Sequence, residues 1–263
     1  MICRDIESHF HEVGPYVDWN QTTDTFKAGD PGREVTTVAV GWKPTWAALK
    51  EAHDRGAELF VSHESLAVRA DNRDPSPERK FALPTEAPKF DWLDETGLVV
   101  FRCHDLWDKF PEIGIRWTWQ KRLLGGTAVG DGYPFLVTQV EPQSLKALAQ
   151  HVLGKVKPLG LNGVLMAGDP DQMVNRVATG TGVSVDPIRM RELGADCGIL
   201  TDDYYLHVRM GAHAQELDFP ALVVNHGVAE EWGIEELAAY LSRTFPNLDV
   251  FHIPQACAYT VVS

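Results

Sequence analysis

The feature that most constrains the fold is a repeat whose two copies lie about half a chain apart. Val38-Ala39-Val40-Gly41 returns 139 positions later as Val177-Ala178-Thr179-Gly180, and Gly56-Ala57-Glu58 returns 138 positions later as Gly194-Ala195-Asp196. Each copy reads as a strand, a helix, a Gly-Ala-acid turn and a second strand. Motifs this short also arise by chance, so the repeat by itself leaves duplication and coincidence both open.

A histidine with an acid four residues later follows the next apolar strand of each half. The first pair is His104 and Asp108, and the second is His226 and Glu230. On a helix this spacing places both side chains on one face, where they can reach one ion. This second correspondence favours duplication over coincidence.

Apolar periodicity and chain breakers predict helices and strands along the whole chain. Expected helices cover 1–13, 46–53, 89–95, 144–153 and a segment starting at 226, and expected strands cover 35–40, 59–61, 98–101, 134–140, 174–179 and 221–224. Glycines and polar residues indicate a loop at 14–34 and turns within 125–132. We therefore predict an α/β protein of two similar, interlinked halves, 1–127 and 128–263, with a metal site between them.

Charge and cysteine content restrict the partners. The chain has 24 basic and 37 acidic residues and a net charge of −13, which disfavours nucleic acid or an anionic membrane as the main partner because both require a basic surface. Its four cysteines are scattered and form no CxxC pair, which indicates reduced thiols. Residues 1–13 lack the basic and apolar regions typical of a signal peptide, and the sequence has no apolar run of membrane-spanning length, so we expect neither. We expect a soluble cytoplasmic protein that acts on a small molecule.

Polar residues at the ends of parallel strands are expected to share one edge of an α/β sheet. The metal ligands that we predict are His63, Glu64, Asp108, His226 and Glu230. Imidazole and carboxylate donors without a thiolate suit zinc, iron, manganese, cobalt or magnesium. Five donors exceed the needs of one tetrahedral ion with an open position, so we expect two divalent ions per chain that share a carboxylate. A metal-bound hydroxide would make this site hydrolytic.

Each of these residues also has an ordinary structural interpretation. A lone His63 or His104 can be a hydrogen-bonded histidine at a strand end, and Glu230 can favour a helix N-terminus through the helix dipole. Asp202 and Asp203, at the corresponding strand end of the repeat, can form a turn. We favour the metal interpretation because four such clusters in a repeated frame would otherwise be separate accidents.

Other motifs give weaker indications. Gly180-Thr181-Gly182 follows a strand but lacks the third glycine of a dinucleotide loop. A group of tryptophans and arginines either lines a pocket for a planar anion or, as we favour, belongs to a core and a subunit contact. The group consists of Trp107, Trp117, Trp119, Arg102, Arg116 and Arg122. The sequence has no GxSxG nucleophile element.

Together the motifs resemble those of the Nif-three-like family of dinuclear-metal proteins, which includes the GTP cyclohydrolase type 2 homologues. The glycine-rich turn of that family is similar to ATGTGVS, its Gly-Ala-Asp strand and T-G-D-x-x-x-H element to RELGADCGILTDDYYLH, and its G-H-x-x-x-E element to VVNHGVAE. Its strand ending in His-His-Pro is similar to RGAELFVSHES, and its H-T-N-L-D element to CHDLWD. The resemblance covers nearly the whole chain. It implies mixed sheets flanked by helices, the short form without an inserted middle domain, and a ring-shaped homohexamer.

The resemblance also assigns roles. His63 falls on the first histidine of the family's pair and Asp108 on the aspartate ligand of the middle motif. The last two ligands of the family fall on His226 and Glu230, and the glutamate can bridge two ions. Histidines that lie at the site in the family fall on His104 and His207.

This chain departs from the family pattern at three positions. Glu64 and Ser65 stand where the family has a second histidine and a proline, and Asp202 stands where it has a glycine. A glutamate can still bind a divalent ion, although it favours a harder metal. Alternatively, Glu64 is a general base and only one ion binds tightly.

We predict a metal-dependent hydrolase in which a metal-bound hydroxide attacks a small molecule. The catalytic residues that we predict are His104, His207 and Glu230, and either histidine would move the proton. The resemblance points to a heterocyclic or amide-like C–N bond, with GTP ring opening as one candidate. The alternative is a non-catalytic, metal-binding ring that serves as a scaffold or regulator.

Overall fold

The computed structural model describes residues 1–71, 74–183, 186–205 and 208–262, which form two compact units. Unit 1 contains Met1–Gly114 and Ile234–Pro254, and unit 2 contains Ile115–Gly233 and Gln255–Ser263. The predicted halves, 1–127 and 128–263, divide the chain once, whereas each unit of the folded chain joins an earlier and a later segment. The chain passes from one unit to the other three times.

Unit 1 is built on a five-stranded sheet with the order β1-β4-β3-β2-β11. The strands are β1 (Phe26–Ala28), β2 (Thr37–Gly41), β3 (Leu59–Ser62), β4 (Val99–Arg102) and β11 (Asp249–His252). Four of them run parallel, and β1 pairs antiparallel with β4. The carboxyl ends of the parallel strands therefore share one edge of a mixed sheet.

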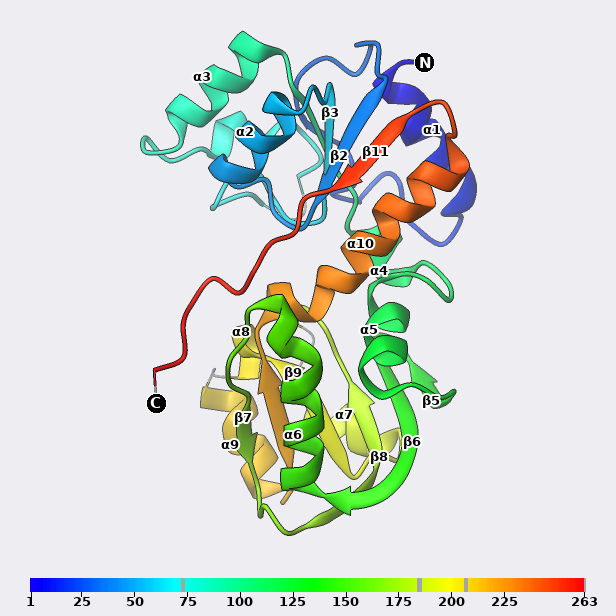
Figure 1. Ribbon diagram of the computed structural model, residues 1–263, viewed down its shortest axis with the longest axis vertical. Helices are drawn as coiled ribbons and strands as arrows, with labels where there is room; N and C mark the ends of the chain where they lie inside the picture. The colour runs from blue at the N-terminus through cyan, green and yellow to red at the C-terminus, as the bar shows by residue number, and fades with distance from the viewer. Residues whose placement is uncertain (72–73, 184–185, 206–207, 263) are drawn as a thin grey trace. The chain divides into compact units, whose positions relative to one another are not determined.

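Helices cover both faces of this sheet (Figure 1). They are α1 (Cys3–Val13), α2 (Trp46–Asp54), the 3-10 helix η1 (Glu78–Phe81), α3 (Ala87–Thr96) and α4 (Asp105–Lys109). Leu49 of α2 and Phe90 of α3 share a core cluster with Val100 of β4. Phe101, the next residue of β4, points to the opposite face and contacts Phe10 of α1 with ring centroids 5.6 Å apart. Adjacent residues of one strand thus serve two cores.

Unit 2 is built on a six-stranded sheet with the order β5-β6-β8-β9-β10-β7. The strands are β5 (Ala128–Gly132), β6 (Phe135–Ser144), β7 (Leu165–Ala167), β8 (Met173–Thr179), β9 (Cys197–Thr201) and β10 (Ala221–Val224). The three strands β8, β9 and β10 run parallel, and the others pair antiparallel with their neighbours. This sheet is also mixed, as predicted.

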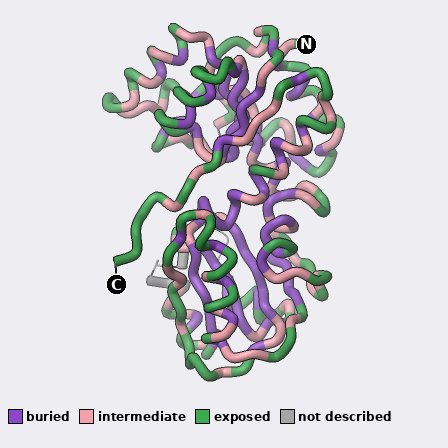
Figure 2. The backbone as a smooth tube through the Cα atoms, in the orientation of Figure 1, coloured by how far each residue is buried: buried purple, intermediate pink, exposed green. Residues whose placement is uncertain are grey.

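The sheet of unit 2 has a core on each face, and its central strands are buried (Figure 2). Its helices are α5 (Ile115–Leu124), α6 (Leu145–Val156), η2 (Lys157–Leu159), α7 (Pro187–Glu192), α8 (Asp202–Tyr205), α9 (Val208–Glu216) and α10 (His226–Thr244). Ile199 of β9 packs with Leu148 of α6, whereas Leu200 packs with Met190 of α7. Helix α10 begins in unit 2 and continues into unit 1 at Ile234.

The internal repeat of the sequence is a repeat of structure. In unit 1, Val38 of β2 pairs with Leu59 of β3 in a parallel ladder. In unit 2, the residues 139 and 138 positions later, Val177 of β8 and Cys197 of β9, pair in the same way. The third strand, β4 or β10, lies on the far side of β3 or β9 in each sheet.

The acid of the Gly-Ala-acid motif accepts backbone hydrogen bonds in both units. One carboxylate, that of Glu58 or Asp196, accepts hydrogen bonds from two successive backbone N–H groups at 2.9 to 3.0 Å; these lie at the start of β2 in unit 1 and within β8 in unit 2. The donors are Thr36 and Thr37 in unit 1 and Asn175 and Arg176 in unit 2. The glycines, Gly56 and Gly194, have φ of 81° and 84°, a conformation that a side chain would strain. The motif therefore joins helix to strand and aligns two strands.

Two predictions about irregular segments were wrong. The expected loop at 14–34 contains β1, and the segment 125–132, where turns were expected, contains all of β5, in which Asp131 pairs with Leu136 of β6. Both are short edge strands, in which pairing with a neighbour outweighs a composition rich in glycine and polar residues. The other expected helices and strands are present, with ends that differ by a few residues.

Candidate metal centre

The first cluster of predicted site residues lies where β3 and β4 of unit 1 end. His63 follows β3 directly, His104 follows β4, and Asp108 lies in the short helix α4. One donor atom from each of these three residues lies within 4.8 Å of the other two. The parallel ladder of β3 and β4 accounts for this, because it delivers both strand exits to the same edge.

The His63 imidazole is buried and has a fixed tautomer. Its Nδ1 lies 3.1 Å from the backbone carbonyl oxygen of Cys103, and because a carbonyl can only accept, Nδ1 carries the proton. Its Nε2 lies 3.5 Å from Asp108 Oδ1. Two donors bound to one ion at about 2.1 Å in a tetrahedral site lie roughly 3.4 Å apart. The spacing of these two atoms therefore fits a shared divalent ion.

The His104 ring stacks on that of His63, with centroids 4.6 Å apart and planes inclined by 18°. Its Nδ1 lies 3.1 Å from Asp105 Oδ1 and 3.7 Å from Asp108 Oδ2. Burial lowers the pKa of His104, but the charge of Asp108 and the hydrogen bond to Asp105 outweigh burial and raise the pKa to about 9. The same hydrogen bond from His104 lowers the pKa of Asp105 to about 2. Without metal, His104 is therefore a cation at neutral pH.

A buried carboxylate that the sequence analysis missed holds this strand exit in place. Asp24 is 1 % exposed and accepts hydrogen bonds at 2.8 to 2.9 Å from the backbone N–H groups of His104, Asp105 and Leu106. Burial raises the pKa of Asp24, against the lowering effect of these donors. Asp24 lies about 80 residues before its partners in a segment without periodicity, so no sequence pattern indicates this role.

Arg102 links His63 to Glu64. The Arg102 side chain is buried, its Nε donates to the His63 carbonyl oxygen at 3.0 Å, and its Nη2 lies 3.6 Å from Glu64 Oε2. The guanidinium thus offsets the negative charge that Glu64 brings to this strand end.

The second cluster of predicted site residues lies in unit 2, at the start of α10. His226 is its first residue and Glu230 lies one turn later, so their side chains share one face. His226 Nε2 lies 3.0 Å from Glu230 Oε2, and the two residues are 8 % and 2 % exposed. A buried imidazole and a buried carboxylate are thus paired at a strand exit, as the spacing predicts.

Both aspartates at the end of β9 contact His226. Asp202 Oδ1 accepts from the His226 backbone N–H at 2.9 Å, and Asp203 Oδ2 lies 2.5 Å from His226 Nδ1. The other oxygen of Asp202 accepts from Asn225 Nδ2 at 3.1 Å and from the Tyr259 hydroxyl at 2.7 Å. The repeat placed these aspartates at a site-bearing strand end, but their contacts with His226 were not predicted.

The Gly180-Thr181-Gly182 turn lies against the same pair. Gly182 has φ of 62°, and a Cβ built on it would lie 3.4 Å from Glu230 Oε1 and 3.6 Å from His226 Nε2. The Thr201 hydroxyl donates to the carbonyl oxygen of Gly182 and fixes the turn. A Cβ at these distances would make ordinary van der Waals contacts, so the positive φ, and not a lack of space, accounts for this glycine without a dinucleotide.

The structure thus groups the predicted site residues within each unit. Unit 1 brings His63, His104 and Asp108 together, and unit 2 pairs His226 with Glu230. His207 lies outside the described residues. The assignment of all these side chains to one metal site stays a prediction.

The tryptophan group is divided. Trp107 and Trp119 are fully buried, so the core interpretation is confirmed for these two. Arg116 lies over the Tyr133 ring, 5.6 Å from its centroid, and forms an ion pair of 2.5 Å with Asp131. A subunit contact at this group stays a prediction.

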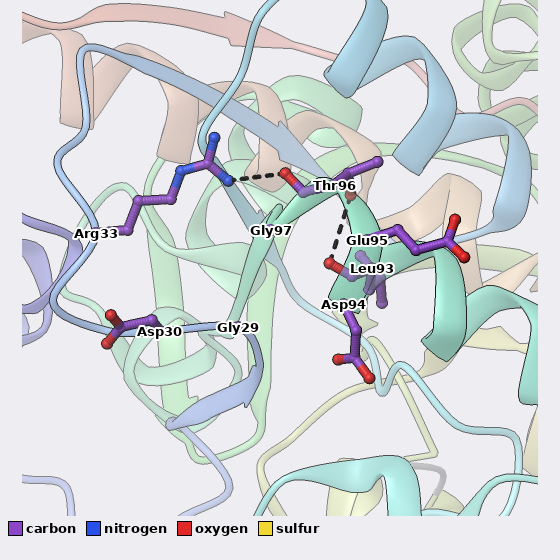
Figure 3. Close-up of a pocket in the computed structure, with 8 residues that line it drawn as sticks. All are labelled: Gly29, Asp30, Arg33, Leu93, Asp94, Glu95, Thr96 and Gly97. Atoms are coloured by element: carbon purple, nitrogen blue, oxygen red, sulfur yellow. Dashed lines mark hydrogen bonds between the residues drawn. The ribbon is translucent and has the colours of Figure 1, made fainter.

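Unit 1 also has a hollow between the end of α3 and the turn after β1 (Figure 3). Its lining residues include three carboxylates, but none of the predicted site residues. Asp94 forms an ion pair of 2.7 Å with Arg79, and Arg33 donates to the Thr96 carbonyl oxygen at 3.3 Å. Asp94 and Arg33 therefore have structural partners, and the hollow supplies no site for the predicted chemistry.

Within the described part of the chain, no helix is both long enough and apolar enough to cross a bilayer.

The sequence profile of the Duf34/NIF3 (NGG1p interacting factor 3) family matches residues 3–257. Comparison with curated protein sequences finds no match.

Several solved structures share the fold. The ybgI protein, of unknown function, is 22 % identical with a TM-score of 0.75, over 96 % of this chain and 98 % of that one. A hypothetical protein of Staphylococcus aureus is 15 % identical with a TM-score of 0.81, over 100 % and 99 %. A Bacillus cereus protein related to NIF3 is 14 % identical with a TM-score of 0.78, over 100 % and 99 %. At these identities the likeness establishes the fold alone.

Proposed function

The chain belongs to the Duf34/NIF3 family, and from this premise we propose that it is a metal-dependent hydrolase that acts on a small molecule. The ligands that we propose for its divalent ions are His63, Glu64, Asp108, His226 and Glu230. Because many chemistries share one fold, the proposal rests on the side chains and not on the family alone.

The observation that carries the proposal is the group of His63, His104 and Asp108. The distance of 3.5 Å from His63 Nε2 to Asp108 Oδ1 exceeds the usual N–H···O range of about 2.7 to 3.2 Å, but it suits two ligands of one ion. The Cys103 carbonyl holds the Nδ1 proton of His63, which directs the Nε2 lone pair towards Asp108. Imidazole and carboxylate donors without a thiolate suit catalytic divalent ions.

A divalent ion held by these donors supplies Lewis-acid activation of water and of a carbonyl, phosphoryl or ring carbon at neutral pH. His104 is the proposed proton carrier, since its pKa of about 9 in the metal-free protein keeps the ring protonated. Asp105, bonded to His104 Nδ1, holds the ring for a transfer to the leaving group. His207 is proposed as a second proton carrier by family resemblance, and Glu230 as a bridging ligand that also accepts a proton.

Glu64 decides how many ions we propose. Arg102 lies 3.6 Å from its carboxylate and offsets the charge that Glu64 adds. We propose that Glu64 is a working ligand and that two ions bind. The competing proposal is that Glu64 is a general base beside a single ion.

The substrate class that we propose is a small molecule with a heterocyclic or amide-like C–N bond. GTP is one candidate because the family resemblance includes GTP cyclohydrolase type 2 homologues. A ring-shaped homohexamer is the assembly that the resemblance implies, and light scattering tests it.

The decisive test is the metal content per chain, measured on untagged protein for wild type and Glu64→His. Two ions in wild type would support the dinuclear site and make Glu64 a ligand. One ion in wild type and two in Glu64→His would mean that this chain has lost one of the two metal-binding positions. The proposal of GTP-like ring opening would then be withdrawn. No metal under any loading condition would remove the site.

Turnover separates hydrolase from scaffold. On a panel containing GTP, cyclic amides and linear amides, His104→Ala and Glu230→Gln should abolish hydrolysis and keep the wild-type circular dichroism spectrum. If wild type binds metal and hydrolyses nothing, while a partner protein co-purifies with or without metal, the scaffold alternative holds.

A further inference from the structure

Asp203 contacts a predicted ligand without belonging to the predicted ligand set. Its Oδ2 lies 2.5 Å from His226 Nδ1, although its side chain is 48 % exposed. A half-exposed carboxylate has no need of a partner for burial. The contact is therefore not needed to compensate for burial of Asp203, and its effect falls on His226.

His226 is held from both sides of its ring and at its backbone. Asp203 faces Nδ1, Glu230 Oε2 lies 3.0 Å from Nε2, and Asp202 accepts from the backbone N–H at 2.9 Å. The two ring nitrogens point away from each other, so Asp203 and Glu230 lie on opposite edges of the imidazole. A cation bound through Nε2 and Glu230 would leave the contact with Asp203 intact.

We propose that Asp203 is a positioning residue for His226. Its carboxylate accepts the Nδ1 proton, so that Nε2, which faces Glu230, is the nitrogen that can bind a cation, and it makes Nε2 a stronger donor. Metal-binding histidines generally donate their second N–H to a carboxylate or carbonyl in this way. The inference rests on the proposed function, since it takes His226 as a ligand.

Unit 1 provides an independent case of the same arrangement. His104 Nδ1 lies 3.1 Å from Asp105 Oδ1, and the other oxygen of Asp105 accepts from the Thr22 hydroxyl at 2.9 Å. Asp105 belongs to the strand exit after β4 and Asp203 to that after β9, so the two carboxylates come from different places in the repeat. The chain thus pairs a site histidine with an Nδ1 carboxylate in each unit.

Asp203 is itself held close to His226 by its neighbour. The Asp202 carboxylate accepts hydrogen bonds from the His226 backbone N–H, from the Asn225 side chain and, at 2.7 Å, from the Tyr259 hydroxyl. These bonds fix the start of α8 against the start of α10. Replacement of the Asp203 carboxylate alone should therefore leave the backbone in place.

The test is a calorimetric titration with Co²⁺ of wild type, Asp203→Asn and Asp203→Glu. The matched control is Glu216→Gln, because Glu216 also faces a histidine Nδ1 in unit 2, at 3.8 Å from exposed His213. We expect Asp203→Asn to weaken binding about 10- to 100-fold and to shift the visible Co²⁺ spectrum. Asp203→Glu should restore much of the affinity, and the control should match wild type.

Two results would overturn the inference. One is Asp203→Asn with wild-type Co²⁺ affinity and spectrum. The other comes from ¹⁵N chemical shifts of histidine-labelled, metal-free wild type, with His226 assigned through His226→Gln, if its Nδ1 carries no proton. The nitrogen measurement needs no metal. Wild type that binds no Co²⁺ but has a protonated Nδ1 would therefore defeat the proposed function and leave the Asp203 contact as inferred.

Discussion

Units 1 and 2 deliver histidines from equivalent parallel strands but hold them by different means. In unit 1, the backbone carbonyl of Cys103 holds His63, and the buried carboxylate of Asp24 holds the backbone that carries His104. In unit 2, two partly exposed side chains, Asp202 and Asp203, hold His226. The strands and the Gly-Ala-acid motif are repeated, and the contacts around the histidines are not.

This difference separates what the fold fixes from what single residues adjust. A backbone carbonyl neither titrates nor changes rotamer, so the orientation of His63 follows from the pairing of β3 with β4. Side-chain carboxylates can be protonated, rotated or replaced. We therefore expect the orientation of His63 in the predicted site to be rigid. The orientation of His226 should change when Asp202 or Asp203 is protonated or replaced.

The largest contrast should come from the two aspartates that hold backbone. Asp24→Ala would leave three N–H groups at the start of α4 without their buried acceptor, and we expect a loss of roughly 3 kcal/mol of unfolding free energy. Asp202→Ala should lose about 1 kcal/mol, since water can replace a partly exposed carboxylate. Urea unfolding of both variants checks this. Equal losses would contradict the contrast between the units.

A second contrast concerns pH in the metal-free protein. The pKa of His104 is raised to about 9 in the folded state, against about 6.5 unfolded. Its contribution, on the order of 2 kcal/mol, is therefore complete below about pH 6.5 and is lost as the pH rises through 9. Urea midpoints measured from pH 6 to pH 10 should fall for wild type. His104→Gln should remove most of that slope, and an unchanged slope would refute the assignment.

At acid pH, Asp105 gives the opposite dependence, in which the free energy of unfolding falls as the pH falls. The pKa of Asp105 is lowered to about 2 by its bond from His104, so its contribution is present above the unfolded value of about 3.9 and is lost as the pH falls towards 2. Asp105→Asn should flatten the acid limb of the stability profile between pH 4 and pH 2. Asp171→Asn, at an exposed position of unit 2, serves as the control and should not.

The repeated motif offers a matched pair of smaller effects. Glu58→Gln and Asp196→Asn each replace a carboxylate that accepts two backbone N–H groups. We expect each to cost about 1 kcal/mol of unfolding free energy. Similar losses in urea would show that the motif is equivalent in energy as well as in geometry, and a loss in only one unit would limit the equivalence to geometry.

The smallest effect should come from Tyr259→Phe, which removes one donor from Asp202. Asp202 keeps its bonds from His226 and Asn225, so we expect a loss of about 0.5 kcal/mol and a change of less than threefold in Co²⁺ affinity. A loss of Co²⁺ affinity as large as that of Asp203→Asn would mean that Tyr259 is a principal determinant of the position of His226.

The sequence predicts this fold where local pattern and burial agree. The buried runs at β3, β4 and β10 are continuous apolar stretches, and the offset from Val38 to Val177 predicts a ladder register that the structure repeats. The strands β1, β5, β7 and β11 were missed or misassigned. They are sheet edges of three to five residues, where pairing with a distant neighbour decides the conformation.

For the candidate site, the sequence predicts contacts between residues that are a few positions apart. It does not predict the residues distant in sequence that hold the site residues in place. The i, i+4 spacing of His226 and Glu230 predicts their contact because one helix carries both. Asp24 and Arg102 act on residues brought close by folding, Asp24 across about 80 positions. A single sequence contains no signal for such partners, because an isolated acid or arginine is compatible with a place at the surface.

The three crossings of the chain between the units bear on how such a gene can be dissected. Unit 1 takes its edge strand β11 from beyond residue 248, after the 115–233 segment of unit 2. A fragment that stops at residue 233 would leave β2 with an open, aggregation-prone edge. The two copies of the repeat thus cannot be separated by one cut into folding fragments, and recombination at the midpoint of the gene would disrupt both units.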